Sequence, residues 1–418
     1  MIDRNYRAPG IWDASQQRQQ CPVHWPAYGA DEIEAACRVL RSGKVNYWTG
    51  EEGRLFEREF ATATESKFAV AVANGTLALE LALYALGVGP GDEVVVPSRT
   101  FVATASCVLM RHAIPVFADV NEESQTLTAE TIEQVLTPRT KGIIAVHLAG
   151  WPCDMEGILA VARAHGLLVI EDCAQAQGAR YKGRPVGSFG DAAAFSFCQD
   201  KIMSTGGEGG MLVTNREDVW RRAWSFKDHG KDTLALKERT GGSEFRWLHH
   251  SAGTNWRMTE IQSALGRTLL PKVPGFIEKR RGNAHLLTHL LRDLPELRIP
   301  VPPDTLFHSY YKYYVFLNPN ALRKGCDRDT VLSAVRAEGI PCFSGTCSEV
   351  YLEKAFHKCP TPKQRLPVAR LLGETSMMFL VHPTLGQNDM LATFNAIKKV
   401  LARADPLNIK QFETIHAT

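Results

Sequence analysis

Short apolar runs alternate with helical stretches between Phe68 and Asn215, and this alternation restricts the fold more than any other feature of the chain. The runs FAVAVAN, DEVVVP, IPVFADV, GIIAVHL and LLVIED are typical of buried strands, and AAAFSF and GGMLVTN continue the series. Between them lie helix-forming stretches such as TLALELALYALG and MEGILAVARAHG. Strands separated by helices predict an α/β domain with a mainly parallel central sheet.

The pattern changes around LLPKVPGF, where two prolines interrupt it. The following FIEKRRGNAHLLTHLLRDL predicts a long amphipathic helix that leads into a less regular C-terminal region. Upstream, DEIEAACRVLRSG predicts a helix that ends at Gly43, with Ile33, Ala36, Cys37 and Leu40 at helical spacing. We therefore expect an N-terminal arm at 1–25, a large domain at 26–272 and a smaller C-terminal α+β domain at 273–418.

Composition excludes several classes of protein. The 48 Lys and Arg residues nearly balance the 45 Asp and Glu residues, which argues against nucleic-acid binding through the phosphate backbone. The 10 cysteines form no CxxC pair or Cys/His cluster with the spacing of metal ligands, so we expect no metal site. No signal peptide or membrane-spanning run is visible, and we expect a cytoplasmic protein without a membrane partner.

The segment from Glu171 to Gly210 carries the strongest chemical signal. Asp172 ends the strand LLVIED, at the edge where open α/β sheets bind ligands. A carboxylate there could keep the ring nitrogen of a pyridine cofactor protonated, or it could simply cap the next helix. Lys201 precedes the glycine-rich STGGEGG, and a lysine on such a turn could form an imine, although most lysines are solvated surface charges.

Other residues could hold the rest of a phosphorylated cofactor. Gly75 and Thr76 open a helix after the strand FAVAVA, where backbone amides suit a phosphate, although a plain helix cap explains them as well. Ser196 faces away from its strand neighbours Phe195 and Phe197 and could bind the same group. Phe101 follows another strand end and could stack on an aromatic ring, or belong to the core.

Taken together, these motifs resemble the DegT/StrS family of pyridoxal-phosphate (PLP)-dependent sugar aminotransferases. The resemblance rests on NGTLAL, PSRTFVATA, EDCAQAQGARYKGRPVGSFGDAAAFSF, the lysine with its GEGG turn, and GTNWRMTEIQSALG, and it covers most of the chain. It implies the aspartate aminotransferase (type I) fold, with three layers around the central sheet of the large domain.

The resemblance also implies roles for individual residues. Lys201 would form the Schiff base with PLP, and Asp172 would pair with the pyridine nitrogen. Gln175 would lie near the phenolic oxygen of the cofactor, and Phe101 would stack on its ring. Gly75, Thr76 and Ser196 would bind the phosphate. Asn255 is similar to a residue that reaches the phosphate from the neighbouring subunit, which implies a homodimer with shared active sites.

The expected reaction moves an amino group from L-glutamate or L-glutamine to a keto sugar in amino-sugar biosynthesis. The expected acceptor is a nucleotide-linked 3- or 4-keto-deoxysugar. A keto-cyclitol is the nearest alternative, and a non-catalytic PLP-binding regulator is a further one. The chain has Ser344, Gly345 and Ser348 where many members carry an HYP-type motif, so we expect selectivity to reside in this region, with Lys227, His229, His308 and Tyr310 as further candidates.

Overall fold

The computed structural model describes residues 24–233, 235, 247–323 and 326–404, so most of the expected N-terminal arm and the last residues of the chain lie outside it. Its centre is a seven-stranded sheet. In sheet order the strands are β1 (Phe68–Val72), β9 (Gly210–Thr214), β8 (Ala192–Ser196), β5 (Leu168–Asp172), β4 (Thr140–Val146), β2 (Glu93–Pro97) and β3 (Ile114–Ala118).

The expected mainly parallel sheet is confirmed. Strands β8, β5, β4, β2 and β3 pair in parallel, whereas β9 is antiparallel to both of its neighbours, β1 and β8. Strand β1 therefore runs in the same direction as β8. The carboxyl ends of all strands except β9 consequently meet at one edge of the sheet.

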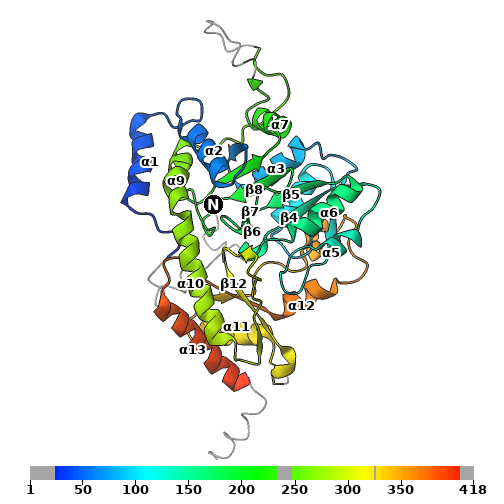
Figure 1. Ribbon diagram of the computed structural model, residues 1–418, viewed down its shortest axis with the longest axis vertical. Coiled ribbons are helices and arrows are strands. Elements are labelled where there is room, and N and C mark those ends of the chain that lie inside the picture. Colours follow the sequence, from blue (N-terminus) through cyan, green and yellow to red (C-terminus); the bar gives the residue numbers. More distant parts are fainter. Residues whose placement is uncertain (1–23, 234, 236–246, 324–325, 405–418) are drawn as a thin grey trace, which may run out of the picture.

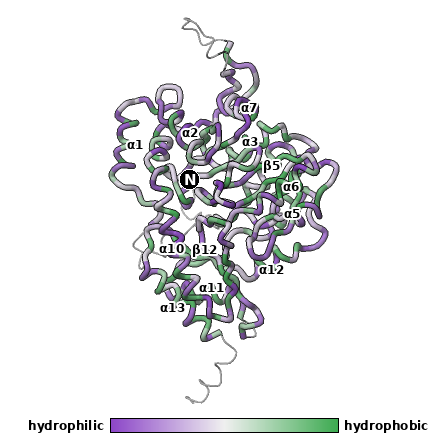
Figure 2. The backbone as a smooth tube through the Cα atoms, in the orientation of Figure 1, coloured by the Kyte–Doolittle hydropathy of each residue, from purple (hydrophilic) through white to green (hydrophobic). Residues whose placement is uncertain are grey.

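Helices cover this sheet because its strands are apolar on both faces (Figure 1). All residues of β2, β8 and β9 are buried. The helices of this part are α1 (Ala30–Ser42), α2 (Glu52–Ala63), α3 (Gly75–Ala85), α4 (Ala103–Met110), α5 (Ala129–Glu133), α6 (Met155–His165), α7 (Glu217–Lys227) and α9 (Glu260–Leu269). Figure 2 shows the apolar segments gathered in the interior and polar ones on the outer helices.

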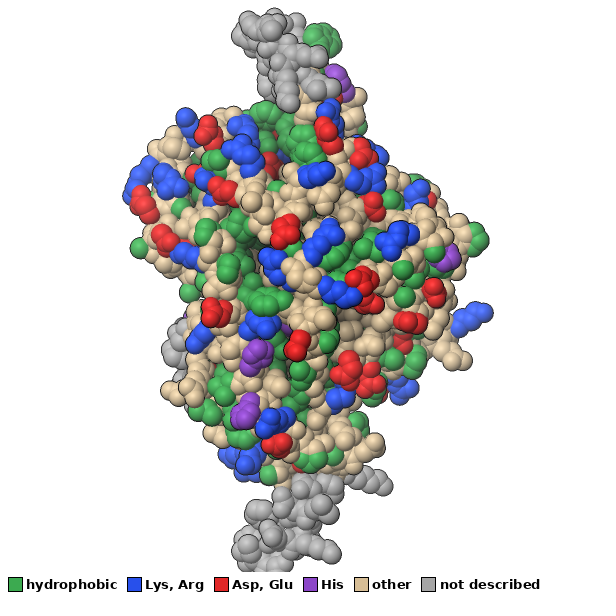
Figure 3. Space-filling model, in the orientation of Figure 1, with side chains coloured by type: hydrophobic (Ala, Val, Ile, Leu, Met, Phe, Trp, Pro, Cys, Tyr) green, Lys and Arg blue, Asp and Glu red, His purple; other side chains and the backbone are tan. Residues whose placement is uncertain are grey.

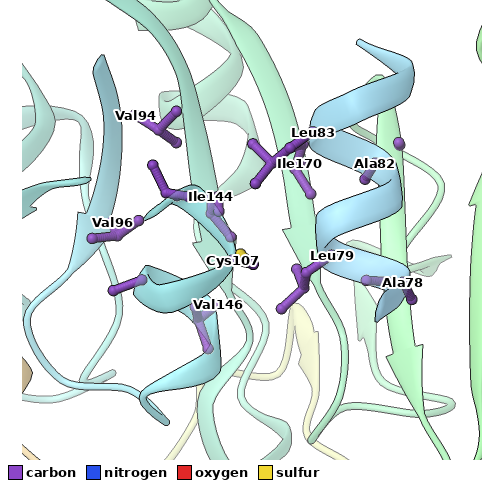
Figure 4. Packing of buried hydrophobic residues seen from close by; sticks show 14 of the residues in the cluster. Ala78, Leu79, Ala82, Leu83, Val94, Val96, Cys107, Ile144, Val146 and Ile170 are labelled. Carbon is purple, nitrogen blue, oxygen red and sulfur yellow. The ribbon is translucent and has the colours of Figure 1, made fainter. Parts of the chain in front are cut away.

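Helix α3 illustrates how the sheet is covered. Its Ala- and Leu-rich sequence favours a helix, and one side of it lies on the strands (Figure 4). Ala78, Leu79, Ala82 and Leu83 face residues of the central strands, and all four are fully or almost fully buried. This packing fixes the N-terminus of α3 beside the carboxyl edge of the sheet.

The C-terminal part contains α10 (Val273–Leu291), the long helix that the sequence predicts. A four-stranded antiparallel sheet follows, with the order β10 (Leu297–Arg298), β12 (Tyr313–Leu317), β14 (Ser376–Phe379) and β13 (Cys342–Phe343). Its helices are α11 (Arg328–Ala337), α12 (Pro367–Thr375) and α13 (Gln387–Ala404). In Figure 1, α10 runs from the large part into this smaller one.

The two parts are joined through shared packing. Tyr314, Phe316 and Tyr351 belong to the same apolar cluster as the strands of the central sheet. In a three-stranded antiparallel sheet, β6 (Arg180–Tyr181) pairs with β11 (Leu306–Phe307) on one side and with β7 (Arg184–Pro185) on the other. The residue limits of the two domains remain a prediction.

One detail of the predicted first helix differs in the structure. Helix α1 forms and ends at Gly43, which has a φ of +67°, as expected of a glycine cap. Its buried apolar side is made by Ala35 and Val39, whereas Ile33 and Leu40 are more than half exposed. The helical spacing predicted the helix but not the side that packs inward.

On the face shown in Figure 3, basic and acidic side chains are interspersed rather than separated into patches of one sign. Within the described residues, no helix combines the length and hydrophobicity needed to cross a bilayer.

Candidate active site

The predicted site residues begin to converge where two strands end and α3 begins. Asp172 is the last residue of β5, and Ser196 is the last residue of the adjacent β8. Gly75 approaches Ser196 so closely that a Cβ on Gly75 would lie 2.6 Å from the Cβ of Ser196. Glycine is therefore required at this position. The close approach brings the first turn of α3 against the Ser196 side chain.

This first turn has the properties of an anion site. The Asn74 side chain caps α3 by accepting a 2.9 Å hydrogen bond from the Leu77 amide, so the cap does not use the Gly75 and Thr76 amides. The Ser196 Oγ accepts a 3.3 Å hydrogen bond from the Cys198 amide, which leaves its hydroxyl proton to donate. Amides, hydroxyl and helix dipole together suit a phosphate.

Asp172 is a buried carboxylate held by two donors. It is 5% exposed, and its Oδ2 accepts a 2.8 Å hydrogen bond from the Thr104 hydroxyl while its Oδ1 accepts one of 3.1 Å from the Ala174 amide. Burial raises the pKa of Asp172, and these hydrogen bonds and the charge of Lys201 oppose that rise. A cation placed against this carboxylate would offset its burial, as a protonated pyridine nitrogen does.

Lys201 lies on the turn after β8, and its amine points at Tyr311. Its Nζ donates a 3.3 Å hydrogen bond to the Tyr311 hydroxyl and lies 3.7 Å from Oδ1 of Asp200. The Tyr311 hydroxyl in turn donates to Asp200. The C-terminal part of the chain thus contributes directly to the environment of the lysine.

A second amine shares this environment. Lys312 Nζ lies 3.8 Å from Asp200 Oδ2, and burial lowers the pKa of Lys312 to about 8. Burial raises the pKa of Asp200, but Lys201, Lys312 and the Tyr311 hydroxyl outweigh it and hold that pKa below its ordinary value. Asp200 is therefore the anion between two lysines.

Gln175 and Phe101 lie at neighbouring positions of the same sheet edge. The Gln175 Oε1 accepts a 2.8 Å hydrogen bond from the Ala149 amide, which follows β4, so the side chain presents its Nε2 as a donor. Phe101 follows β2 and is 62% exposed. The core alternative for Phe101 is therefore wrong, because this ring presents its surface to a possible stacking partner.

Asn255 lies on a loop beside the start of α3. The Ala73 amide donates a 3.0 Å hydrogen bond to the carbonyl of Trp256, which follows Asn255. The Asn255 side chain is exposed, and its backbone forms an isolated bridge with Asp228.

Glu171, next to Asp172, has a structural role. One carboxylate oxygen accepts hydrogen bonds from the Phe189 and Gly190 amides, and the other accepts from Gly187 and lies 3.0 Å from His147 Nε2. Burial raises the pKa of Glu171, but these donors outweigh burial and lower it overall. The possible metal-ligating atoms of His147, Glu171 and Cys173 lie within 4.8 Å of one another. In this group, the Glu171 carboxylate already accepts the hydrogen bonds from the loop amides.

The selectivity candidates are divided by the structure. Lys227, His308 and Tyr310 are buried, and burial lowers the pKa of His308 to about 3. The loop of Ser344 to Ser348 instead borders the site, because its Cys347 carbonyl accepts a 3.1 Å hydrogen bond from the Thr100 amide beside Phe101.

Sequence reasoning missed Thr104, Asp200 and Tyr311. Thr104 lies within PSRTFVATA, four residues after Thr100, and Asp200 immediately precedes Lys201, so local signals existed for both. Tyr311 lies 110 positions from Lys201, and no local pattern joins them.

Comparison with known proteins decides the family. Residues 26–398 match the model of the DegT/DnrJ/EryC1/StrS aminotransferase family. The chain belongs to this family. It is 38% identical to UDP-N-acetyl-3-dehydro-alpha-D-glucosamine 3-aminotransferase of Acidithiobacillus ferrooxidans over 359 residues, 85% of this chain and 90% of the relative. It is 34% identical to dTDP-3-amino-3,4,6-trideoxy-alpha-D-glucose transaminase of Streptomyces venezuelae over 379 residues, 90% of this chain and 93% of the relative.

Solved structures agree with this assignment. An aminotransferase from Psychrobacter cryohalolentis is 51% identical and superposes with a TM-score of 0.89, covering 91% of this chain and 99% of its own. DegT/DnrJ/EryC1/StrS aminotransferases depend on PLP. The described residues fit that cofactor, because a tight Gly75–Ser196 cradle, a buried carboxylate and an exposed aromatic ring occur along one sheet edge.

We expect Glu171→Gln to lower the free energy of unfolding by about 3 kcal/mol at pH 7, since the new amide group would face donors instead of accepting from them. Urea unfolding followed by fluorescence measures this loss. The exposed Glu34, which pairs with Arg41, supplies the control, and Glu34→Gln should change the value by less than about 0.5 kcal/mol. Equal effects of the two substitutions would contradict the structural part given to Glu171.

Proposed function

We propose that this aminotransferase transfers an amino group from L-glutamate or L-glutamine to a nucleotide-linked 3- or 4-keto-deoxysugar, with PLP attached at Lys201. The observation that carries the proposal is the position of the partly buried Lys201 on the turn after β8, next to strand β5, which ends at the buried Asp172 carboxylate. An amine and a carboxylate in this relation suit the two ends of one pyridine aldehyde.

The remaining residues supply the other contacts of the cofactor. Gly75, Thr76 and Ser196 would bind the phosphate through amides and hydroxyls, and Phe101 would stack on the ring. The Nε2 of Gln175 would donate to the phenolic oxygen, because the Oε1 already accepts from the Ala149 amide. When bound, PLP supplies the electron sink for the carbon that gains or loses the amino group.

Lys201 has a second task in this proposal. With its amine free, Lys201 would act as general base and acid and would move a proton between the reacting carbons. The Tyr311 hydroxyl then holds the Nζ by the hydrogen bond that the structure contains, and Asp200 orients that hydroxyl. Thr104 keeps the Asp172 carboxylate in place.

The acceptor is inferred from two lines of support. Of the two relatives, one is named for a UDP-linked 3-dehydro sugar and the other for a dTDP-linked 3-amino sugar. In this chain, the loop of Ser344 to Ser348 is joined to the residue before Phe101 by the Thr100–Cys347 hydrogen bond, and its Ser344 is exposed. We propose that this loop contacts the sugar.

We expect turnover with a UDP- or dTDP-linked keto sugar to exceed turnover with an uncharged keto-cyclitol by at least about 100-fold in kcat/KM, because the nucleotide contributes binding energy remote from the reacting carbon. Mass spectrometry of the amino product measures both. Lys201→Ala should lower the rate by at least roughly a thousand-fold. Equal or better use of the cyclitol would refute the sugar assignment.

We further propose a homodimer in which Asn255 completes the phosphate site of the neighbouring subunit. The exposure of Asn255 supports this arrangement, since the residue is accessible to a second copy of the chain. In such a dimer, subunits carrying Lys201→Ala and subunits carrying Asn255→Ala should complement each other.

When Lys201→Ala and Asn255→Ala subunits are mixed, each mixed dimer should contain one intact site, with Lys201 from one chain and Asn255 from the other. Random mixing of equal amounts should restore about a quarter of the wild-type sites. Activity after unfolding and refolding the mixture together measures this recovery. If activity stays at the level of the separate variants, Asn255 does not act across the interface.

A further inference from the structure

The first described residues of the chain lie across the turn that carries Lys201. The Trp25 indole Nε1 donates a 2.7 Å hydrogen bond to the backbone carbonyl of Lys201. Three residues later, the Tyr28 hydroxyl accepts a 3.1 Å hydrogen bond from the Gly206 amide and lies 3.3 Å from the Ser204 carbonyl. Two side chains from the N-terminal segment thus bind the backbone at the start and the end of one turn.

The turn is also held by hydrogen bonds from the Met203 amide to Gln177 Oε1 and from the Thr205 amide to the Phe197 carbonyl. It contains no helix or strand between Lys201 and Gly209, and Gly206 and Gly207 have φ values of +82° and +112°. Such glycines make the backbone permissive. Contacts from outside the turn therefore have a large part in fixing the direction in which the Lys201 side chain leaves the backbone.

Trp25 is itself held in one orientation. Its ring packs edge-to-face on Phe276, with centroids 5.1 Å apart, and stacks towards His382 at 6.4 Å. The guanidinium carbon of Arg280 lies 5.1 Å from its centroid, which is within the range of a cation–π contact. An indole fixed on several sides can fix its hydrogen-bond partner.

The same contacts reach the amine end of Lys201. The buried Arg280 donates a 3.0 Å hydrogen bond from Nη1 to the Tyr311 carbonyl, and the Tyr311 hydroxyl accepts from Lys201 Nζ. Trp25 thus contacts the Lys201 carbonyl, Tyr311 contacts the Lys201 amine, and Arg280 contacts both Trp25 and Tyr311.

We propose that Trp25 is a positioning residue for Lys201, and that its indole N–H sets the geometry in which the lysine reaches the cofactor aldehyde. This inference rests on the proposed attachment of PLP at Lys201. It gives the segment before α1 a part in catalysis without any contact to the substrate. Small errors in the position of a reacting group are expected to be costly, on the order of 100-fold for about 1 Å.

Trp25→Phe isolates the hydrogen bond, because it keeps an aromatic ring among Phe276, Arg280 and His382 and removes the N–H. We expect PLP to bind about 10-fold more weakly and kcat to fall by about 10-fold, while KM for the keto substrate changes less than about 2-fold. Trp247, which is 88% exposed, provides the matched control, and Trp247→Phe should change none of these values.

A double-mutant cycle separates positioning from simple packing. The Kd for PLP is measured by absorbance for the wild type, Trp25→Phe, Lys201→Ala and the double variant. If Trp25 acts through Lys201, Trp25→Phe weakens binding only when Lys201 is present. Equal weakening in both backgrounds, or no weakening in either, would overturn the proposal.

Hydrogen exchange without added PLP gives an independent readout. Amides of residues 201–207 should exchange faster in Trp25→Phe than in the wild type or in Trp247→Phe, and Tyr28→Phe should affect the Gly206 amide most. Unchanged exchange in both Trp25→Phe and Tyr28→Phe would contradict the inference. If the wild type does not bind PLP, the proposed function is wrong. If the wild type binds PLP and Trp25→Phe binds it equally well, only the inference about Trp25 is wrong.

Discussion

The burial of one carboxylate, Asp172, is the constraint on which the site depends. An ion at the end of a central strand is costly unless donors and a cation compensate for its burial. Thr104 and the Ala174 amide supply the donors, and Lys201 supplies part of the positive charge. Because this compensation is incomplete, the pKa of Asp172 stays raised, and the site favours a ligand that brings a cation to that carboxylate.

The adjacent residue, Glu171, points to the opposite side of the sheet and stabilises a loop. Its carboxylate accepts hydrogen bonds from amides of the loop 187–190, which fixes this loop to the sheet just before β8 begins. Strand β8 follows this loop and ends at Ser196, so that Ser196 and the turn containing Lys201 lie at the edge where α3 begins. Because successive residues of a strand point to opposite sides, Glu171 binds the neighbouring loop while Asp172 is directed towards the proposed cofactor site.

Local patterns in the sequence predicted much of this arrangement. The apolar alternation indicated the mainly parallel sheet, and parallel strands end at one edge, so Asp172, Ser196 and Gly75 could be expected near one another. Tyr311 and Trp25 could not be found in this way, because their contacts with Lys201 join segments more than 100 residues apart. The inward side of α1 was also beyond the pattern, since Ile33 and Leu40 are as apolar as the residues that became buried.

We propose that Lys201 holds PLP so that an amino donor can displace it. The most direct measurement is the visible absorption spectrum of the purified protein with PLP, before and after addition of L-glutamate or L-glutamine. The account predicts that the band of the lysine-bound aldehyde form falls and that of the amine form rises with one of these donors. No lysine-bound band, or a band that neither donor changes, would contradict it.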